Sequence, residues 1–362
     1  MSRCIDRFIR RIRKVNDEAF PRESQATQEG DLVSPFNVMR RPNQMPGNRN
    51  RGSQIRAYLL VVCAALLWAS AGTASKYLFN RGTNPYVLVQ CRVTFSALLV
   101  LAYLLLCKPR LLTIKVRDLW YFVPLGALGF AGVQVTYLVA ISKIKVALAI
   151  LLQYLTPFFV AIYSYLFLKE RMDRWKVISL FLAFTGCFFA AEAYRVSFLS
   201  LNIHGVIAGL LSAVFFSFYS LLGERVMHGY NPWSVLFYAF VFAALLLNIV
   251  LSPTNLISWG PGLRPWFLVL YIASFGTAVP FGFYFMGIEH LRTTRASIVA
   301  TLEPISAGFL SFIVVGEILT PWQIFGGLLV IISIIIIQSR REVDLEAPVY
   351  KKRSSSTKRR DS

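Results

Sequence analysis

Charged residues are scarce in this 362-residue chain. They make up 15% of it, whereas 56% of the residues are hydrophobic and the mean hydropathy is +0.56. A soluble globular domain carries about 25% charged residues. The scarcity of charge therefore excludes an ordinary soluble domain and indicates that the bilayer is the solvent for most of the chain.

The sequence motifs of several enzyme and pump classes are also missing. There is no GxxxxGK phosphate-binding loop, which argues against an ATP-driven pump within this chain, and no HExxH metalloprotease motif. The five cysteines form no CxxC pair, and the three histidines are scattered. We therefore expect no enzyme activity, no metal site and no cofactor.

Positive charge is the exception to this scarcity, with 38 Lys and Arg residues against 18 Asp and Glu residues and a net charge of +20. Such an excess raises nucleic acid as a partner. Here, however, the basic residues lie in tails and short loops between apolar runs, where they fit membrane orientation and contact with anionic lipid. We expect no nucleic-acid partner. Residues 1–56 and 340–362 are predicted to be basic cytoplasmic tails, the first largely disordered and without a cleavable secretory signal.

Ten apolar segments approach the length of about 20 residues that a membrane span needs. With the N-terminus inside, 31 of the 38 Lys and Arg residues fall on the inner side, so both termini are predicted to be cytoplasmic. The segments are predicted near 57–78, 85–106, 118–141, 146–168, 174–193, 203–224, 233–251, 265–288, 295–316 and 321–339.

Two stretches of the chain are copies of one another at an offset of 147 residues. Residues 153–175 read QYLTPFFVAIYSYLFLKERMDRW, and residues 300–322 read ATLEPISAGFLSFIVVGEILTPW. The matched pairs include Pro157 with Pro304, Glu170 with Glu317, and Asn84-Pro85 with Asn231-Pro232. Apolar helices share composition easily, but they do not share proline and glutamate positions over such a length. The chain is therefore predicted to contain two related repeats, 57–193 and 203–339.

Each predicted repeat contains five spans, an odd number, so the second repeat must enter the membrane in the opposite sense. Inverted repeats of this kind build many secondary transporters, with a site near the bilayer midplane and alternating access to its two sides. The predicted fold is therefore an all-α polytopic membrane protein with ten transmembrane helices in two inverted five-helix repeats.

A pattern of the fourth and fifth predicted spans recurs in the second repeat. It is Ala149, Pro157, Glu170, Trp175 and Gly186, recurring as Ala296, Glu303-Pro304, Glu317, Trp322 and Gly326. With the region of Trp68 in the first span and Arg92 in the second, this pattern resembles the EamA-type transporters of the drug/metabolite transporter superfamily.

The resemblance implies a central cavity that opens to one side at a time, and movement of small organic metabolites, commonly outward. It also implies that the fifth and tenth spans lie away from the cavity, where they allow contact with another copy in a homodimer. With the cytoplasmic termini, it favours the plasma membrane.

Glu303 is the clearest candidate for a functional residue, because a charge deep in a bilayer is costly and is kept for a reason. It precedes Pro304 and has Thr156, not a second acid, at its matched position. A carboxyl group there suits proton exchange or contact with a substrate ammonium group. The structural alternative is a neutral or paired glutamate that bonds a neighbouring helix at a proline kink, as the family resemblance also allows.

Arg92 lies within the second predicted span. Its guanidinium suits a substrate carboxylate or phosphate. The alternatives are that it extends toward the membrane surface or pairs with an acid such as Glu192.

An aromatic set is predicted to line a cavity, namely Trp68, Tyr137, Tyr219 and Tyr284, with Gln153 as a further polar contact. The alternative for each aromatic residue is helix packing, and for Gln153 a hydrogen bond between helices. The repeat-matched residues Pro157, Pro304, Glu170 and Glu317 are expected to have structural or interfacial roles.

These observations predict a secondary transporter of small organic metabolites, with amino acids or related amphoteric solutes as a hypothesis because acid and arginine share the cavity. Proton coupling through Glu303 is part of the same hypothesis. Two alternatives stay open: a lipid translocase, which needs a groove open to the bilayer, and a membrane scaffold that transports nothing.

Overall fold

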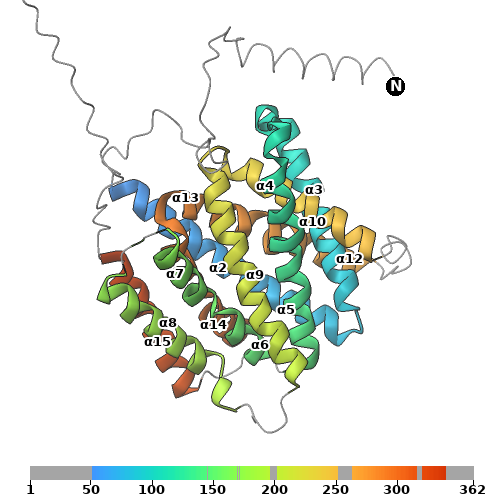
Figure 1. Ribbon diagram of the computed structural model, residues 1–362. Helices are drawn as coiled ribbons and strands as arrows, with labels where there is room; N and C mark the ends of the chain where they lie inside the picture. Colours follow the sequence, from blue (N-terminus) through green and yellow to red (C-terminus); the bar gives the residue numbers. More distant parts are fainter. Residues whose placement is uncertain are drawn as a thin grey trace, which may run out of the picture.

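The computed structural model describes residues 51–144, 146–168, 170, 172–195, 202–251, 263–315 and 320–339. Within these residues the structure is all-helical, with no β-strand (Figure 1). The helices are α2 (Arg51–Asn80), α3 (Pro85–Cys107), α4 (Leu119–Pro124), α5 (Ala131–Lys143), α6 (Val146–Gln153), α7 (Thr156–Leu166), α8 (Arg174–Ala190), α9 (Ile203–Met227), α10 (Pro232–Val250), α12 (Leu263–Ala273), α13 (Val279–Ala300), α14 (Glu303–Val315) and α15 (Pro321–Ser339).

Eight helical stretches of the described residues are long and apolar enough to cross a bilayer. Together with the family match reported below, they make the chain an integral, multi-pass membrane protein. Helices α8, with 17 residues, and α14, with 13 described residues, are shorter. The count of ten spans stays a prediction, and both predicted tails, apart from residues 51–56, lie outside the described residues.

The repeated Asn-Pro pairs begin equivalent helices. Asn84 and Asn231 have extended backbones, and each side-chain oxygen accepts a hydrogen bond from the backbone N–H two residues later, at 2.9 and 3.0 Å. The proline that follows occupies the first helical turn, where its missing N–H costs nothing. The same local signal therefore sets the start of α3 and of α10.

Two helical spans are interrupted at matched positions. Helix α6 ends before Tyr154 and α7 begins at Thr156, whereas α13 ends before Thr301 and α14 begins at Glu303. Because 154 and 301 differ by the repeat offset of 147, the two breaks are equivalent. The proline that follows each break lacks a backbone donor. Each span therefore presents the N-terminus of a half-helix inside the bundle.

A second matched irregularity is a π-helical segment in each repeat. One, η3, covers Leu125–Phe130 and lies between α4 and α5; the other, η6, covers Ser274–Ala278 and lies between α12 and α13. Each contains one glycine of the matched pair Gly129 and Gly276. Segments of this type are rare and frequently occur at functional sites.

Helices α8 and α15 pack on each other at one edge of the bundle (Figure 1). A Cβ atom added to Gly326 would lie 2.5 Å from backbone atoms of α8, and one added to Gly186 would lie 2.7 Å from the Gly326 carbonyl. The glycines therefore permit backbone contact between these helices. Their place at the edge agrees with the position expected of the fifth and tenth spans.

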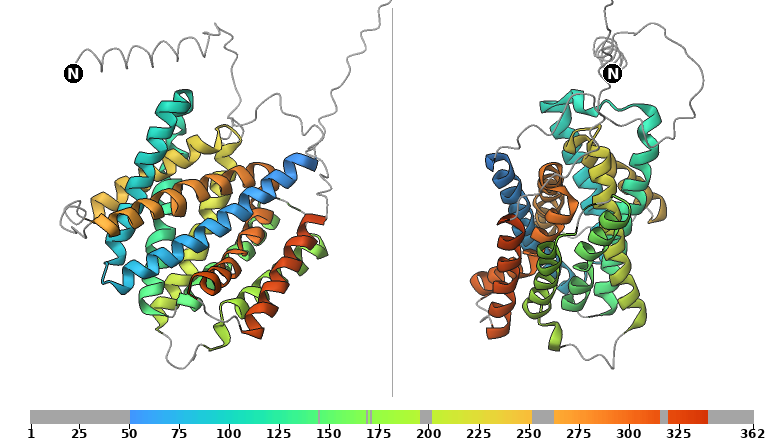
Figure 2. Two further views of the ribbon diagram at one scale, coloured as in Figure 1. Left: turned by 180° about the vertical axis from the view of Figure 1, so that it is seen from behind. Right: turned by 60° about the vertical axis from the view of Figure 1, so that its left-hand side comes forward.

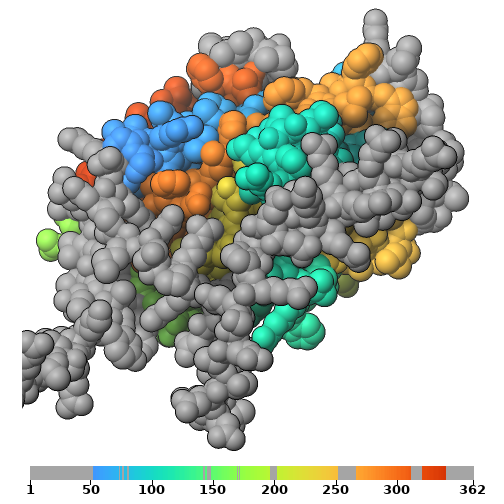
Figure 3. Space-filling model, turned by 90° about the horizontal axis from the view of Figure 1, so that it is seen from above, coloured from blue at the N-terminus to red at the C-terminus, as the bar shows by residue number. Residues whose placement is uncertain are grey.

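Helices α2 and α13 form the other extended pairing. They run side by side across one face of the bundle (Figure 2) and lie next to each other when the molecule is seen from above (Figure 3). Helix α2 also packs on α14 and η6. Helix α2 thus contacts the half-helix α14 and the π-helical segment η6, which are the irregular segments of the second repeat.

Candidate functional site

The two matched helix breaks meet inside the bundle. Tyr154, in the break of the first repeat, donates a hydrogen bond from its hydroxyl to the carboxylate of Glu303, at the start of α14 in the second. Cys187 of α8 donates a weak bond of 3.7 Å to the Thr301 carbonyl in the same break. Glu303 is therefore held at the contact between the two repeats.

Arg92 of α3 lies close enough to Glu303 and to Tyr137 for electrostatic interaction with both. Its Nε donates to the hydroxyl of Thr277 in the π-helical segment η6, over 3.2 Å. Among the described residues, no carboxylate is in ion-pair contact with the Arg92 guanidinium. The arginine and the acid therefore face each other at a distance, without neutralising each other directly.

These groups remain partly accessible although protein surrounds them. Arg92, Tyr137, Gln153 and Glu303 are each half-buried, whereas Tyr154 is buried. The structure thus brings together three of the predicted site residues, Arg92, Tyr137 and Glu303, which we call the charged cluster. Gln153 is the last residue of α6, directly before Tyr154.

The remaining predicted site residues form an aromatic cluster, which we define as Trp68, Phe216, Tyr219, Phe281 and Tyr284. The ring of Trp68 lies 5.0 Å from that of Phe281 and 5.5 Å from that of Tyr284. Tyr284 and Tyr219 are fully buried, and the Tyr284 hydroxyl bonds Ser220 at 3.1 Å. In this structure Trp68 and Tyr219 each pack on Phe216 and Phe281, and within the cluster only Phe216 is half-buried.

The charged and aromatic clusters are neighbours. Thr277, which binds Arg92, and Phe281, which contacts Trp68, are four residues apart in continuous helical structure. Residues at that spacing lie on one face of a helix, about 6 Å apart along its axis. One small molecule is therefore long enough to reach both clusters.

The suggested pairing of Arg92 with Glu192 is wrong. Glu192 instead forms an ion pair with Arg195 at 3.2 Å and accepts a hydrogen bond from the Thr320 hydroxyl at 3.2 Å. The sequence did contain a signal for this pairing, because Arg195 follows Glu192 by three residues.

The four repeat-matched structural residues can be placed only in part. Pro157 and Pro304 lie in the first turns of the half-helices α7 and α14. Glu170 forms an ion pair with Lys176 at 2.6 Å and accepts a hydrogen bond from the Thr294 hydroxyl at 3.0 Å, so it joins three segments. Glu317 lies outside the described residues.

Helix α13 is interrupted at Arg292, whose φ of 65° and ψ of 158° are not helical. The carboxylate of Glu224 in α9 accepts hydrogen bonds from the Thr293 backbone N–H at 3.0 Å and from its hydroxyl at 2.5 Å. These bonds satisfy donors that the interruption leaves without helical partners. We call the five residues joined by these contacts, Glu224, Thr293, Thr294, Glu170 and Lys176, the α13 network.

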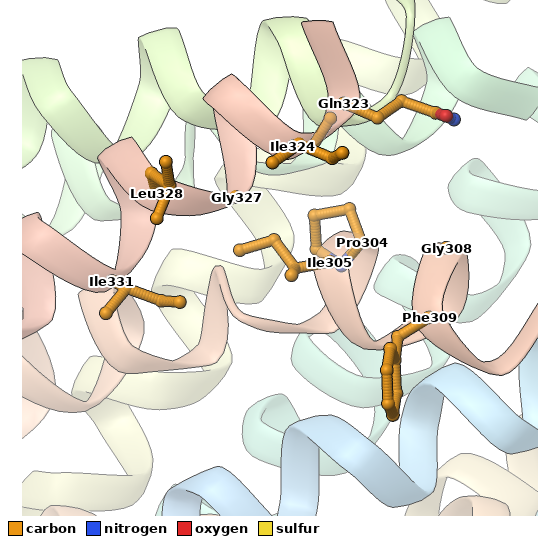
Figure 4. A pocket seen from close by; sticks show the side chains of 10 residues that line it. Pro304, Ile305, Gly308, Phe309, Gln323, Ile324, Gly327, Leu328 and Ile331 are labelled. Carbon is orange, nitrogen blue, oxygen red and sulfur yellow. The ribbon is translucent and has the colours of Figure 1, made fainter. Parts of the chain in front are cut away.

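An apolar groove of about 250 Å³ lies between α14 and α15 (Figure 4). Its lining includes Pro304, Phe309 and Leu328, and the last two are more than half exposed on the outside of the bundle. Gln323 is the polar side chain among its lining residues. The groove therefore faces the surroundings of the helices, and its chemistry suits hydrocarbon.

Tyr154, Thr277 and Glu224 are among the residues that make these contacts and were not predicted as site residues. Tyr154 precedes the proline of the first repeat by three residues, so the repeated proline could have directed attention to it. Glu224 is a charged residue at the end of a predicted span and could have drawn attention for that reason. Thr277 carries no such signal, because its role depends on which helix lies opposite.

The family model described as the EamA-like transporter family matches residues 55–191 and again 203–339. The chain belongs to the EamA-like transporter family. Family membership and the membrane-spanning helices together make it a membrane transporter, and the names of its relatives point to transport and not to an enzyme.

Individual relatives of this EamA family member include transporters with named substrates. It is 25% identical over 297 residues to an uncharacterized inner membrane transporter, YicL, of Salmonella typhimurium, covering 80% of this chain and 98% of the relative. It is 26% identical to the riboflavin transporter ImpX of Fusobacterium nucleatum, covering 78% and 97%. Over 131 residues it is 31% identical to the pseudopaline exporter CntI of Pseudomonas aeruginosa, covering 35% and 45%.

A solved crystal structure supports the fold of this EamA family member. The match has a TM-score of 0.64 at 19% sequence identity, and covers 77% of this chain and 95% of the other. The likeness at this identity concerns the fold alone.

Proposed function

We propose that this protein is a secondary transporter of small amphoteric metabolites, amino acids among them, which binds its substrate between Arg92 and Glu303. The observation that carries the proposal is the charged cluster. A guanidinium and a carboxylate lie inside a membrane protein, close enough to interact, and the guanidinium has no carboxylate in direct contact among the described residues. A molecule with one carboxylate and one ammonium group matches both.

The energetics favour such an occupant. A buried charge without a partner is costly in a low-dielectric interior, and a charge-assisted hydrogen bond stabilises it by about 1.5–3 kcal/mol. A substrate carboxylate suits the planar guanidinium of Arg92. Glu303 is left to accept the ammonium group, or to take up a proton when no substrate is present. This exchange is the physical basis of the proposed proton coupling.

The matched helix breaks support the same interpretation. Transporters with inverted repeats commonly bind substrates at interrupted helices near the membrane midplane, where half-helix N-termini favour negative charge. Both half-helices of this chain begin beside the charged cluster, at Thr156 and Glu303. We therefore propose ten spans in two inverted five-helix repeats, which alternate access to the site from the two sides.

The setting in the cell is part of the proposal. The distribution of Lys and Arg supports cytoplasmic termini in the plasma membrane, with anionic lipid at the basic tails. The relatives named for riboflavin and pseudopaline transport organic metabolites, and one of them is named as an exporter. They support an organic substrate and favour export. A homodimer through α8 and α15 is compatible with their place at the edge of the bundle.

The test is transport by the full-length protein in proteoliposomes, with and without an imposed pH gradient. The panel holds labelled zwitterionic amino acids, monocarboxylates and monoamines. We expect gradient-dependent flux of zwitterions, reduced at least tenfold in Glu303→Gln and in Arg92→Gln, because each loses a charge-assisted contact. Arg195→Gln, which removes an exposed arginine, is the control and keeps its flux. Zwitterion flux that survives both interior substitutions would contradict the proposal.

The apolar groove is the reason to test one alternative function, that of a lipid translocase. The groove between α14 and α15 faces hydrocarbon, as such an activity requires, but Gln323 alone among its lining residues offers a polar contact to a headgroup. Labelled phospholipid is therefore added to the panel. Lipid flux without flux of any soluble solute would replace the amphoteric-metabolite proposal with this alternative.

A further inference from the structure

Two buried hydrogen-bond donors in the aromatic cluster have no hydrogen-bond partner. The indole Nε1 of Trp68 and the hydroxyl of Tyr219 are both inaccessible and unbonded, on side chains that are 9% and 0% exposed. The hydroxyl of Tyr284 in the same cluster is bonded to Ser220, so the environment does supply partners where the fold needs them. A buried unpaired donor destabilises the fold and calls for a reason.

The two donors belong to rings that border the same neighbours. Trp68 lies 6.3 Å from Phe216 and 5.0 Å from Phe281. Tyr219 lies 6.4 Å and 5.9 Å from the same two rings. Both unpaired donors are therefore set in a wall of aromatic faces and edges. Such a wall suits a flat ring, and the indole N–H can only donate.

The aromatic wall is also within reach of the charged cluster. Helical structure brings Thr277, which holds Arg92, within about 6 Å of Phe281 along the helix axis. Phe216 is half-buried, so one ring of this wall keeps some accessible area. A substrate whose charged end lies between Arg92 and Glu303 would therefore direct its other end at the two donors.

We infer that the preferred substrates carry, besides their amphoteric end, a planar ring whose edge bears an oxygen acceptor, and that Trp68 and Tyr219 donate to this oxygen. The inference rests on the proposed function and narrows its substrate class. In the absence of substrate the two donors stay unpaired, and the substrate oxygen satisfies them. Trp68 and Tyr219 thereby discriminate ring-bearing substrates with an acceptor from those of equal shape without one.

The test compares two zwitterions of nearly equal shape, para-acetylphenylalanine and para-isopropylphenylalanine, which differ in the ring-edge carbonyl. Dissociation constants are measured by calorimetry on the full chain in detergent. We expect the unaltered protein to bind the acetyl compound about tenfold more tightly, the size of effect that a satisfied donor gives. Tyr219→Phe should lose most of this preference. Trp68→Phe should also lose most of it, and serves as the test if Tyr219→Phe fails to fold.

Thermal stability supplies the matched control. Because the Tyr219 hydroxyl has no partner, Tyr219→Phe should melt at the same temperature as the unaltered protein or higher. Tyr238→Phe removes a hydroxyl that donates to the Leu112 carbonyl at 2.6 Å, so it should melt lower and keep the preference for the acetyl compound. Loss of binding without loss of stability is the result that a packing role for Tyr219 does not produce.

Each other outcome decides the question. Equal binding of the two compounds by the unaltered protein overturns the inference. A preference that is unchanged in both Tyr219→Phe and Trp68→Phe also overturns it. Water as the partner of both donors would give either of these results. If neither compound binds while proteoliposomes still carry aliphatic zwitterions, the inference fails and the proposed function stands. If no zwitterion is carried at all, the proposed function fails and takes the inference with it.

Discussion

Replacing Thr293 with valine tests whether the α13 network keeps helix α13 folded after its interruption at Arg292. The substitution keeps the size and branching of the side chain but removes the hydroxyl that donates to Glu224 at 2.5 Å. The backbone N–H bond to the same carboxylate, at 3.0 Å, remains available. Thr293 is fully buried, so water does not replace the lost bond while the segment is folded.

The expected magnitude follows from the chemistry of this bond. A hydrogen bond to a charged acceptor contributes about 1.5–3 kcal/mol, and about 1.4 kcal/mol is a factor of ten in an equilibrium. Opening of the segment that begins at Thr293 should therefore become about ten- to a hundredfold more frequent in Thr293→Val. The neighbouring bond from Thr294 to Glu170 persists and limits the effect to the first turn.

Amide hydrogen exchange of the full-length protein measures this opening directly. Protection of the amides that follow Arg292 should fall by that factor, while protection in α10 stays unchanged. Thr136→Val is the control, because the Thr136 hydroxyl bonds carbonyls of its own helix at 2.7 and 3.3 Å. Equal protection after Arg292 in Thr293→Val and in the unaltered protein would refute the role given to Glu224.

Three further predictions concern packing, pH and helix capping. Gly326→Ala should destabilise the fold by about 1–3 kcal/mol, because its Cβ would lie 2.5 Å from backbone atoms of α8. Gly327→Ala should be close to neutral, because the nearest atom to its Cβ would be 3.5 Å away. Thermal melts of the two variants test this difference. Burial, and then the hydrogen bond that Tyr230 donates to Asp118, raise the pKa of Tyr230 from 10 to about 12. The stability that this tyrosine contributes is therefore full below pH 10 and is lost as the pH rises to about 12; a Tyr230→Phe variant with an identical pH profile would contradict this. Asn231→Ala should cost about 1 kcal/mol by removing the cap of α10, and an unchanged melting temperature would argue against it.

Local sequence signals account for some of the irregular parts of the fold, but not for all of them. The offset of 147 residues showed that Pro157 and Pro304 are equivalent, and a proline removes a donor wherever the fold places it, but a kink was considered only at Pro304. The spans predicted from residues 85 and 233 begin at, or one residue from, the starts of α3 and α10. The π-helical segments were not foreseen, because no residue type requires one, and Gly129 and Gly276 are equally compatible with close packing.

The site was predictable in its residues but not in their contacts. Arg92 and Glu303 stood out because charges inside a membrane are costly, and the structure brings them together. The assignment of Glu192 to Arg92 failed because partner choice depends on local geometry, and Arg195 is nearer. Trp68, Tyr219 and Tyr284 were predicted as a cavity wall; their burial within the aromatic cluster depends on how α2, α9 and α13 meet, which no local pattern encodes.

The most direct test of the amphoteric site separates the two charges of one substrate. Counterflow in proteoliposomes would be measured for labelled alanine against unlabelled alanine, alaninamide, which lacks the carboxylate, and N-acetylalanine, which lacks the ammonium group. If Arg92 binds the carboxylate and Glu303 the ammonium group, Arg92→Gln should weaken competition by N-acetylalanine about tenfold and leave alaninamide unchanged, and Glu303→Gln should do the reverse. Both substitutions weakening all three competitors equally would contradict the account and leave the two residues with a structural role.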